Sequence, residues 1–388
     1  MEAERKTAAH EVIVVGAGAI GLSIGWRLAQ RGVRTLVLEA AQPAAGATGV
    51  AAGMLAPVTE ADFGEEALIA LNLASLERWP AFAAELQSAS GIDCGYRESG
   101  TLTVAVDRDE EAALRRMHAY QRSLGLDAGW LSARECRALE PGLAPRIAGG
   151  IHAPHDHQVA PRLLAEALVA ALGRAGGELR TDARVEGLKW RPHGVSVELK
   201  QGDPLDAGAV VIAAGAHSGT LSGVPEHERI PVRPVKGQIL RLRACAPLTL
   251  PARRVIRTPE VYAVPREDGD LVVGATVEER GWDRTVTAGG VLELLHRAYE
   301  ALPGVAELEL VEAAAGLRPG TPDNGPIVGE SSTRGLWWAT GHWRNGILLA
   351  PLTAEAVAGA LTGEEPPEEF DPFGPRRFTA GARAGVAG

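Results

Sequence analysis

Residues 11–39 constrain the fold of this chain more than any other stretch. A β-branched run at 12–15 is followed by the motif Gly-Ala-Gly-Ala-Ile-Gly at 16–21, and a second apolar run lies at 36–38. Short apolar runs of this kind are typical of buried strands. Between them, apolar and small residues recur at helical spacing over 20–28. The stretch therefore predicts a βαβ unit with its glycines at the turn from strand to helix.

The glycine motif predicts a binding site for a dinucleotide. Gly16 permits the tight turn, Gly18 lets the backbone approach a pyrophosphate, and Gly21 lets helix and strand pack closely. The pyrophosphate is then expected at the positive end of the helix. Glu39 ends the second strand, where a carboxylate accepts hydrogen bonds from a ribose. The motif alone does not distinguish NAD from FAD.

Composition and charge limit the classes of function. The chain has 388 residues, enough for two domains with cores of their own, and 46% of them are hydrophobic. The net charge is −10, from 39 basic and 49 acidic residues, and no basic cluster stands out. Nucleic-acid binding therefore has no electrostatic support.

The sequence also predicts a cytoplasmic protein that does not enter a membrane. The N-terminus has mixed charge and lacks the apolar core of a signal peptide. Two uncharged stretches, 40–59 and 207–225, are rich in glycine and alanine and contain proline, so neither predicts a membrane span. Cys94, Cys136 and Cys245 lie far apart, which fits buried thiols in a reducing compartment better than disulfides or a zinc site.

Residues 42–57 form a run of small side chains directly after the βαβ unit. Such a run cannot fill a core by itself. It is either a flexible loop or a backbone that lies against a flat ligand where larger side chains would clash. Its position after a nucleotide-binding unit favours the second interpretation.

The segment 152–157 contains three histidines and Asp156, which are residue types that bind zinc. Their spacing around Pro154 fits no regular element, and no fourth protein ligand is evident. We therefore expect a polar loop here and no metal site.

Further periodic segments indicate the remaining elements. Strand-like runs at 238–243, 261–265 and 270–276 suggest an antiparallel sheet in a second domain. Ser132 and Glu135 form the pattern of a capping box at a helix start. The longer helices are expected at 65–91, 109–124, 161–172, 291–302 and 347–361.

Five motifs, in this order along the chain, resemble those of the D-amino-acid-oxidase-like FAD flavoproteins. Within that family, the stretches 262–276 and 342–351 are most similar to the glycine oxidases of thiamine biosynthesis. The similarity runs from residue 11 to 363, nearly the whole chain. The motifs are the glycine motif at 16–21, Ala-Ala-Gly-Met at 51–54, Ala-Ala-Gly at 213–215, Arg-Pro-Gly-Thr-Pro-Asp at 318–323 and Gly-His-Trp-Arg-Asn-Gly-Ile at 341–347.

The resemblance implies an α/β fold with two domains. One is a Rossmann-like FAD-binding domain of the discontinuous GR2 type, and the other is an α+β substrate domain built on an antiparallel sheet. The FAD-binding domain is expected to comprise 10–88, 146–230 and 312–363, and the substrate-binding domain 89–145 and 231–311. Residues 364–388, rich in Pro, Glu, Gly and Arg, predict a flexible tail.

The resemblance also implies FAD bound without a covalent link, because Gly316 occupies the place where sarcosine oxidases carry a flavin-linking cysteine. The tetrad 344–347 predicts free N–H groups at a helix start, beside the flavin edge that gains negative charge on reduction. Val185 resembles the position whose backbone touches adenine. The residues expected to hold FAD are Gly16, Gly18, Ala19, Ile20, Glu39, Ala40, Thr48, Ala51, Ala52, Gly53, Met54, Val185, Ala214, Gly215, Gly341, Arg344, Asn345, Gly346 and Ile347.

Three residues resemble the catalytic site of the family. Arg318, in an apolar, glycine-rich turn at 316–320, resembles the arginine that anchors the amino-acid carboxylate. Its guanidinium offers two parallel N–H bonds to a carboxylate. Tyr262 resembles the tyrosine that supports this carboxylate, and the alternative is a core or interface tyrosine. Arg344 resembles a second active-site arginine, and the alternative is a cap on the flavin turn.

Two positions depart from the family pattern. Glu260 stands where some glycine oxidases carry a histidine near the pocket mouth, and Val277 stands where a methionine lines the pocket. We expect the first to affect substrate orientation and the second to affect pocket width.

The implied reaction is oxidative deamination of a small amino acid, with glycine first and then sarcosine and D-alanine. Hydride transfer from Cα to the flavin needs no side-chain base, and O2 then reoxidises the flavin with release of H2O2. The alternatives are an oxidase or dehydrogenase of a larger D-amino or imino acid, a non-catalytic flavin subunit, and a flavoenzyme that modifies nucleic acid, which the acidic charge disfavours. The resemblance also implies a homo-oligomer that supplies thiamine thiazole synthesis.

Overall fold

The predicted βαβ unit forms at the start of the described chain. In this computed structural model, which describes residues 10–378, β1 (His10–Val15) pairs in parallel with β2 (Thr35–Leu38). Helix α1 (Ala19–Gln30) connects them. Gly16 has a φ of +108°, and a Cβ atom there would lie 2.5 Å from the carbonyl oxygen of Ala213. Only glycine fits this turn without strain.

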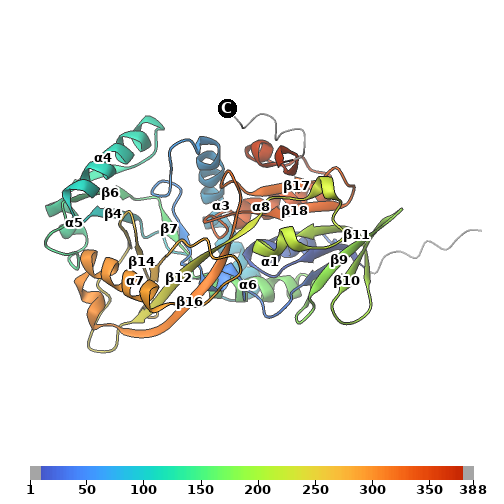
Figure 1. Cartoon of the computed structure of the whole chain (residues 1–388), viewed down its shortest axis with the longest axis horizontal. Helices are drawn as coiled ribbons and strands as arrows, with labels where there is room; N and C mark the ends of the chain where they lie inside the picture. The colour runs from blue at the N-terminus through green and yellow to red at the C-terminus, as the bar shows by residue number, and fades with distance from the viewer. Residues whose placement is uncertain (1–9, 379–388) are drawn as a thin grey trace, which may run out of the picture.

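The first sheet contains this unit (Figure 1). Its strand order is β17-β18-β11-β1-β2-β8, with β10 and β9 continuing from β11. Strands β18, β11, β1, β2 and β8 are parallel, and the others are antiparallel to their neighbours. The bounds are β8 (Glu178–Arg180), β9 (Val185–Arg191), β10 (Gly194–Leu199), β11 (Leu205–Ile212), β17 (Ile327–Glu330) and β18 (Leu336–Thr340).

Four helices form the main core with this sheet. They are α1, α3 (Glu66–Ser90), α6 (Pro161–Arg174) and α8 (Ala350–Leu361), and α1 packs against both α6 and α8. Their apolar side chains share one buried cluster with those of β1, including Trp26, Trp79 and Phe82. Burial of this area holds the β1–α1 turn in a fixed position.

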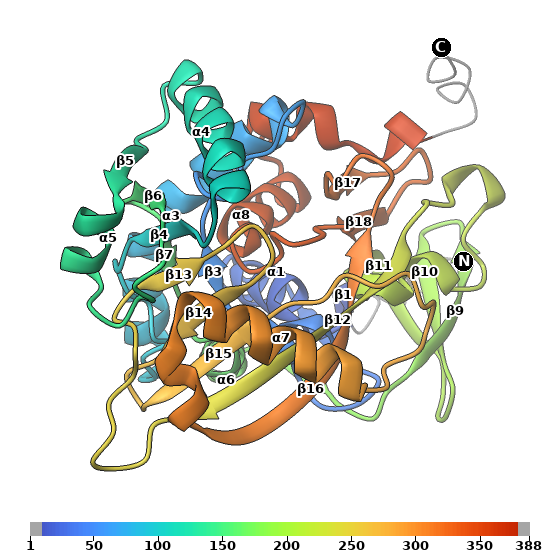
Figure 2. The same ribbon diagram turned by 60° about the vertical axis from the view of Figure 1, so that its left-hand side comes forward.

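The second sheet has the strand order β16-β12-β15-β14-β13-β4-β6-β5 and lies beside the first (Figures 1 and 2). All its pairs are antiparallel except β13 with β4. The bounds are β4 (Thr101–Ala105), β5 (Gly129–Ser132), β6 (Gly149–Ala153), β12 (Arg233–Arg243), β13 (Val255–Arg257), β14 (Tyr262–Pro265), β15 (Asp270–Gly274) and β16 (Glu309–Gly320).

Three helices accompany the second sheet. They are α4 (Arg108–Ser123), α5 (Ala133–Leu139), which begins with the predicted capping box, and α7 (Ala288–Ala301), which packs on β12 and β15. Shorter elements are α2 (Ala47–Val50), β3 (Met54–Leu55), β7 (His157–Gln158) and the 3-10 helices η1 (Gly215–Thr220), η2 (Glu226–Glu228), η3 (Pro303–Glu307), η4 (Glu368–Phe373) and η5 (Pro375–Phe378).

The predicted fold class is confirmed: an α/β unit with a parallel sheet is joined to a second unit on a largely antiparallel sheet. The predicted domain ranges remain a prediction. By sheet membership, β6 and most of β16 belong with the second sheet, although they fall in the ranges 146–230 and 312–363 predicted for FAD binding.

Two predictions near the candidate site were wrong in detail. Arg318 lies on β16 rather than in a turn, because Gly316 and Gly320 pair in register with Gly237 and Arg233 of β12. Helix α8 begins at Ala350 rather than at 347, because the preceding residues first form separate turns.

The prediction of a flexible tail was wrong for residues 364–378, whereas 379–388 lie outside the described residues. Phe370 and Phe373 are both 5% exposed and join the core cluster of the first sheet. Arg377 forms an ion pair with Asp323 at 2.8 Å. Composition suggested disorder here because two buried aromatic residues are a small fraction of a polar segment.

The histidine segment forms no metal cluster. Within residues 10–378, no group of three or more His, Cys, Asp or Glu side chains is placed to hold a metal ion, and no helix there is long and apolar enough to cross a membrane. Asp156 is fully buried and accepts hydrogen bonds from the Val58 and Thr59 N–H groups. Cys94 and Cys136 are buried thiols, but Cys245 is exposed, contrary to the prediction.

We expect Phe373→Ala to lower the free energy of unfolding by about 3–5 kcal/mol, because it removes a buried ring from the core. Phe63→Ala is the control, since Phe63 is 57% exposed. Urea unfolding measures both. Equal midpoints for the two variants would show that the segment 364–378 does not contribute to the core.

Candidate functional site

One cavity, of about 980 Å³, is lined by residues from both sheets. Its wall includes the β1–α1 turn, the small residues after β2, the end of β11, and parts of β12, β16 and the turn before α8. The volume is of the size expected for a large organic ligand.

Glu39 and Thr48 organise the part of the cavity near the glycine motif. Glu39 accepts hydrogen bonds from the Ala17 N–H at 2.8 Å and the Ala41 N–H at 3.0 Å, each on a different carboxylate oxygen. Each oxygen retains a lone pair for a ribose hydroxyl. Thr48 Oγ1 accepts from the Ala19 N–H at 3.0 Å. The N-terminus of α1, capped by Gly18 without a side-chain bond, faces this space with its positive dipole.

The residues present fit a dinucleotide. Segment 40–53 contributes mainly glycine and alanine to the cavity wall, so its backbone can lie close to a flat ligand. At Gly18, a Cβ atom would come within 3.2 Å of Thr48 Oγ1 and occupy the space over the helix start. This geometry agrees with the predicted role of the small-residue run.

Nearly all residues predicted to hold FAD line this one cavity. Among the described residues of that set, Gly341 and Asn345 are the exceptions. Gly341 has a φ of +75°, and Asn345 is buried with its N–H bonded to the His342 carbonyl at 2.8 Å. Both shape the turn before α8. The individual roles of the lining residues stay predictions.

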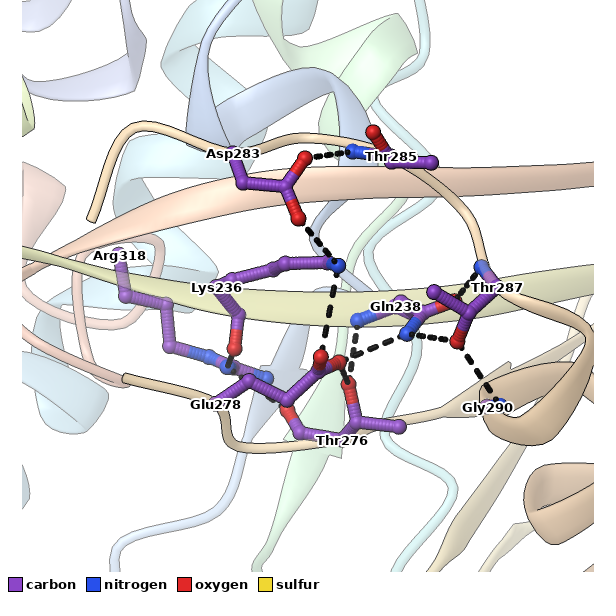
Figure 3. Close-up of polar contacts among 9 residues, drawn as sticks. All are labelled: Lys236, Gln238, Thr276, Glu278, Asp283, Thr285, Thr287, Gly290 and Arg318. Atoms are coloured by element: carbon purple, nitrogen blue, oxygen red, sulfur yellow. Dashed lines mark hydrogen bonds and ion pairs between the residues drawn. The ribbon is translucent and has the colours of Figure 1, made fainter. Parts of the chain in front are cut away.

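Arg318 and Tyr262 come together at the second sheet. Arg318 Nη1 donates to the Thr276 carbonyl at 3.0 Å and to the Lys236 carbonyl at 3.4 Å (Figure 3). A Cβ atom on Gly237 would collide with this guanidinium, and one on Gly274 would lie 2.5 Å from the Tyr262 hydroxyl. Two glycines on neighbouring strands thus make room for the two side chains, which both line the cavity.

The electrostatics suit an anionic group beside Arg318. Burial raises the pKa of Tyr262, although the charge of Arg318 opposes the shift, so the phenol stays protonated and able to donate.

His342 also lines the cavity, where its Nε2 lies 3.1 Å from Thr353 Oγ1. Burial lowers the pKa of His342 to about 3, which keeps it neutral near pH 7.

Arg344 is an exposed residue of the otherwise largely buried turn before α8, and it lines the same cavity. Its neighbour Trp343 has a φ of +47° and donates its N–H to the Pro319 carbonyl at 3.1 Å. This bond ties the turn to β16, the strand of Arg318. Both alternatives for Arg344, substrate contact and support of the turn, stay open.

The two positions that depart from the family pattern do not line the cavity in the described structure. Glu260 forms an ion pair with Arg297 of α7 at 2.5 Å, and Val277 is 64% exposed. The expected direct effects on substrate orientation and pocket width therefore lack support from the geometry.

Sequence reasoning missed several cavity residues. Glu60 has a side chain 9% exposed, lies 3.4 Å from Arg257, and adds a carboxylate to the wall near Tyr262. Trp282, Arg284 and Trp343 also line the cavity. Trp343 lies within the motif at 341–347, so that motif could have indicated it. The other residues stand in no recognisable local pattern.

The fold and the cavity define a class of protein. A glycine turn at the end of a parallel strand and an acid at the end of the next strand line one cavity, which is the arrangement of a dinucleotide-binding protein. The guanidinium of Arg318 lies in the wall of the same cavity.

The family model for DAO, FAD dependent oxidoreductase, matches residues 11–360. The chain therefore belongs to this family, and it is an FAD-dependent oxidoreductase of the amino-acid oxidase type. FAD supplies the capacity to accept two electrons when it is bound in the cavity. The residues that would hold it are those around Gly18, Glu39 and Thr48.

The relatives agree with this assignment. The chain is 37% identical to the glycine oxidase of Geobacillus kaustophilus, over 94% of this chain and 96% of that protein. The crystal structure of glycine oxidase from that organism has a TM-score of 0.87, covering 95% of this chain and 98% of that one. Iminodiacetate oxidase from Chelativorans sp. BNC1 has a TM-score of 0.84 at 28% identity, covering 94% and 100%.

A third relative is a larger protein. The chain is 35% identical to the bifunctional protein ThiO/ThiG of Trichormus variabilis, over 95% of this chain but 55% of that protein. The chain thus spans about half the length of this relative.

Acid precipitation is expected to release all FAD into the supernatant and leave a colourless pellet. Gly316 has no side chain to link to the flavin, and a Cβ atom there would collide with Val50. The absorbance spectra of supernatant and pellet measure this. Yellow colour that stays with the pellet would show a covalent link and contradict the prediction.

Proposed function

We propose that this protein oxidises glycine, and more slowly sarcosine and D-alanine, with FAD as its cofactor and O2 as the electron acceptor. The observation that carries the proposal is the position of Arg318 and Tyr262 in the same cavity as the glycine motif. Similarity to glycine oxidases over 94% of the chain supports the choice of substrate.

Arg318 binds the substrate carboxylate in this proposal. Its guanidinium already uses Nη1 for the Thr276 and Lys236 carbonyls, which fix its plane. The other N–H donors of the guanidinium are then held in fixed directions, so substrate binding needs no further ordering of the side chain. The protonated hydroxyl of Tyr262 donates a further hydrogen bond to the same carboxylate. Because glycine has no side chain, its binding requires no further pocket.

The chemistry balances with these groups. Glycine loses a hydride from Cα and a proton from nitrogen, and the resulting imine takes up water to give glyoxylate and ammonia. O2 receives the two electrons and two protons and leaves as H2O2. The residues of the chain orient the substrate and exclude water, and no side-chain base is required for the hydride step.

The biological setting is also a proposal. The relative ThiO/ThiG supports a role in thiamine thiazole synthesis. We further infer a cytoplasmic protein that forms a homo-oligomer. Exposed apolar side chains on α7 and β16, among them Leu292, Tyr299 and Leu310, support self-association.

A second candidate function is oxidation of an imino diacid. Two arginines, Arg318 and Arg344, line one cavity, and two cations suit a substrate with two carboxylates. The structural similarity to iminodiacetate oxidase points the same way. Peroxide release from iminodiacetate but not from glycine would favour this candidate over the first.

Arg318→Ala is expected to raise the KM for glycine about 30-fold or more, since loss of one partner of a charged hydrogen-bonded pair typically costs about 2–5 kcal/mol. Arg318→Lys should recover only part of this loss because an ammonium cannot bind in two parallel bonds. Peroxide-coupled kinetics measure both variants.

FAD content, measured by absorbance, is the control and should match the unmodified protein in both variants. Unchanged KM values with full FAD would remove Arg318 from the substrate site.

A further inference from the structure

The connection between β15 and α7 carries a second, unassigned part of the cavity wall. We call residues 277–287 the strap. Figure 2 shows this segment reaching from β15 past β12 toward the first sheet before it returns to α7. Most of its residues are exposed, yet Trp282 and Arg284 line the same cavity as the glycine motif.

A buried lysine anchors the strap on β12. The Lys236 side chain is 1% exposed, and its Nζ lies 3.4 Å from Glu278 Oε2 and 3.3 Å from Asp283 Oδ2 (Figure 3). The backbones of Lys236 and Glu278 exchange two hydrogen bonds of 2.9 Å. A buried ammonium is costly unless it is paired, so these ion pairs fix the strap against the strand.

Further bonds hold both ends of the strap. Gln238 Nε2 donates to Glu278 Oε1 at 2.7 Å, and the Thr287 N–H donates to Gln238 Oε1 at 2.9 Å. Asp283 accepts from the Thr285 N–H at 2.8 Å, and hydrogen bonds from Thr285 lower the pKa of Asp283 to about 2. Asp283 therefore remains charged and paired with Lys236 through the neutral pH range.

The outer part of the strap contacts the nucleotide-binding unit. Trp282 stacks on His217 of η1, with ring centroids 4.4 Å apart and planes at 16°. Arg284 Nη2 lies 3.5 Å from the Ala45 carbonyl. The preceding residue, Ala44, donates its N–H to the Ala17 carbonyl of the glycine turn at 2.9 Å. These contacts bring the Arg284 guanidinium to the segment that packs on the predicted pyrophosphate site.

The charge of Arg284 also acts on His217, the ring on which Trp282 stacks. Burial lowers the pKa of His217, and the positive charges of Arg184 and Arg284 lower it further, whereas Glu39 acts in the opposite direction. Arg284 and Glu39 thus both act on His217, and both line the cavity. The glycine turn itself offers only backbone N–H groups and the helix dipole to a diphosphate.

We propose that the strap is a cofactor-binding element of the second sheet, in which Arg284 pairs with the diphosphate of FAD and the Trp282–His217 stack closes the wall beside it. Arg284 adds charge-assisted hydrogen bonds to a diphosphate that otherwise rests on neutral N–H groups. Lys236 is a positioning residue that holds the strap in place.

This arrangement connects the two halves of the cavity. The Lys236 and Thr276 carbonyls that fix Arg318 belong to the anchor and to the residue just before the strap. The inference rests on FAD binding and is independent of which amino acid is oxidised.

The test is a titration of the apoprotein with FAD, followed by flavin and tryptophan fluorescence. Arg284→Ala is expected to raise the Kd for FAD roughly tenfold and to weaken the dependence of this Kd on salt. Arg280→Ala is the matched control, because Arg280 is an exposed arginine of the strap that does not line the cavity in the described structure. It should leave the Kd unchanged.

Two further measurements distinguish the loss of a contact to the diphosphate from a general distortion of the cavity. ADP and adenosine are tested as competitors of FAD. Arg284→Ala should weaken the binding of ADP and leave the binding of adenosine unchanged. Lys236→Met should raise the Kd for FAD, and Arg284→Ala should add little on that background.

Equal Kd values for FAD in Arg284→Ala and Arg280→Ala would overturn the proposal. Equal losses of affinity for ADP and for adenosine in Arg284→Ala would overturn it as well. Additive effects of Lys236→Met and Arg284→Ala would refute the anchoring role of Lys236. None of these readouts uses turnover, so they stand apart from the kinetics that test glycine oxidation.

Discussion

The fixed orientation of Arg318 is the interaction on which this site depends. The guanidinium extends from β16 over Gly237 of β12, where any larger residue would displace it. Two backbone carbonyls, from Lys236 and Thr276, hold one of its nitrogen atoms. A cationic side chain that is already oriented loses little freedom when it binds a carboxylate. The absence of a side chain at Gly237 is therefore as important as the arginine itself.

The two sheets contribute different things to one cavity. The first sheet provides the glycine turn, Glu39 and the start of α1, all fixed by the helical core around Trp26. The second sheet provides Arg318, Tyr262 and the strap. The turn before α8 connects them, because the Trp343 N–H bonds to Pro319 of β16. The wall of the cavity is thus made from residues far apart in the sequence.

Much of the fold and part of the site follow from local sequence. The glycine motif predicted the βαβ unit because strand, turn and helix are all encoded within residues 11–39. Ser132 and Glu135 formed the predicted capping box for the same reason. Arg318 was predicted to belong to the site and it lines the cavity, but its position on a strand was not predicted. Gly316 and Gly320 suggest a turn until the pairing with β12, more than 70 residues earlier, is known.

Other features depend on contacts that no local pattern records. Phe370 and Phe373 reach the core from a segment whose composition suggests disorder. Glu60 and Arg284 enter the cavity wall from connections that otherwise resemble solvated loops. Lys236 is buried on a strand because two acids from the strap neutralise it. Long-range pairing decides each of these positions, and a single sequence contains no direct sign of it.

A crystal structure of the protein with FAD and glycolate, a carboxylate that lacks the amine of glycine, tests the central claim most directly. The account predicts the glycolate carboxylate on the Arg318 guanidinium and the Tyr262 hydroxyl, with the flavin ring beside it in the same cavity. A flavin ring remote from Arg318, or glycolate bound elsewhere while Arg318 faces solvent, would contradict it.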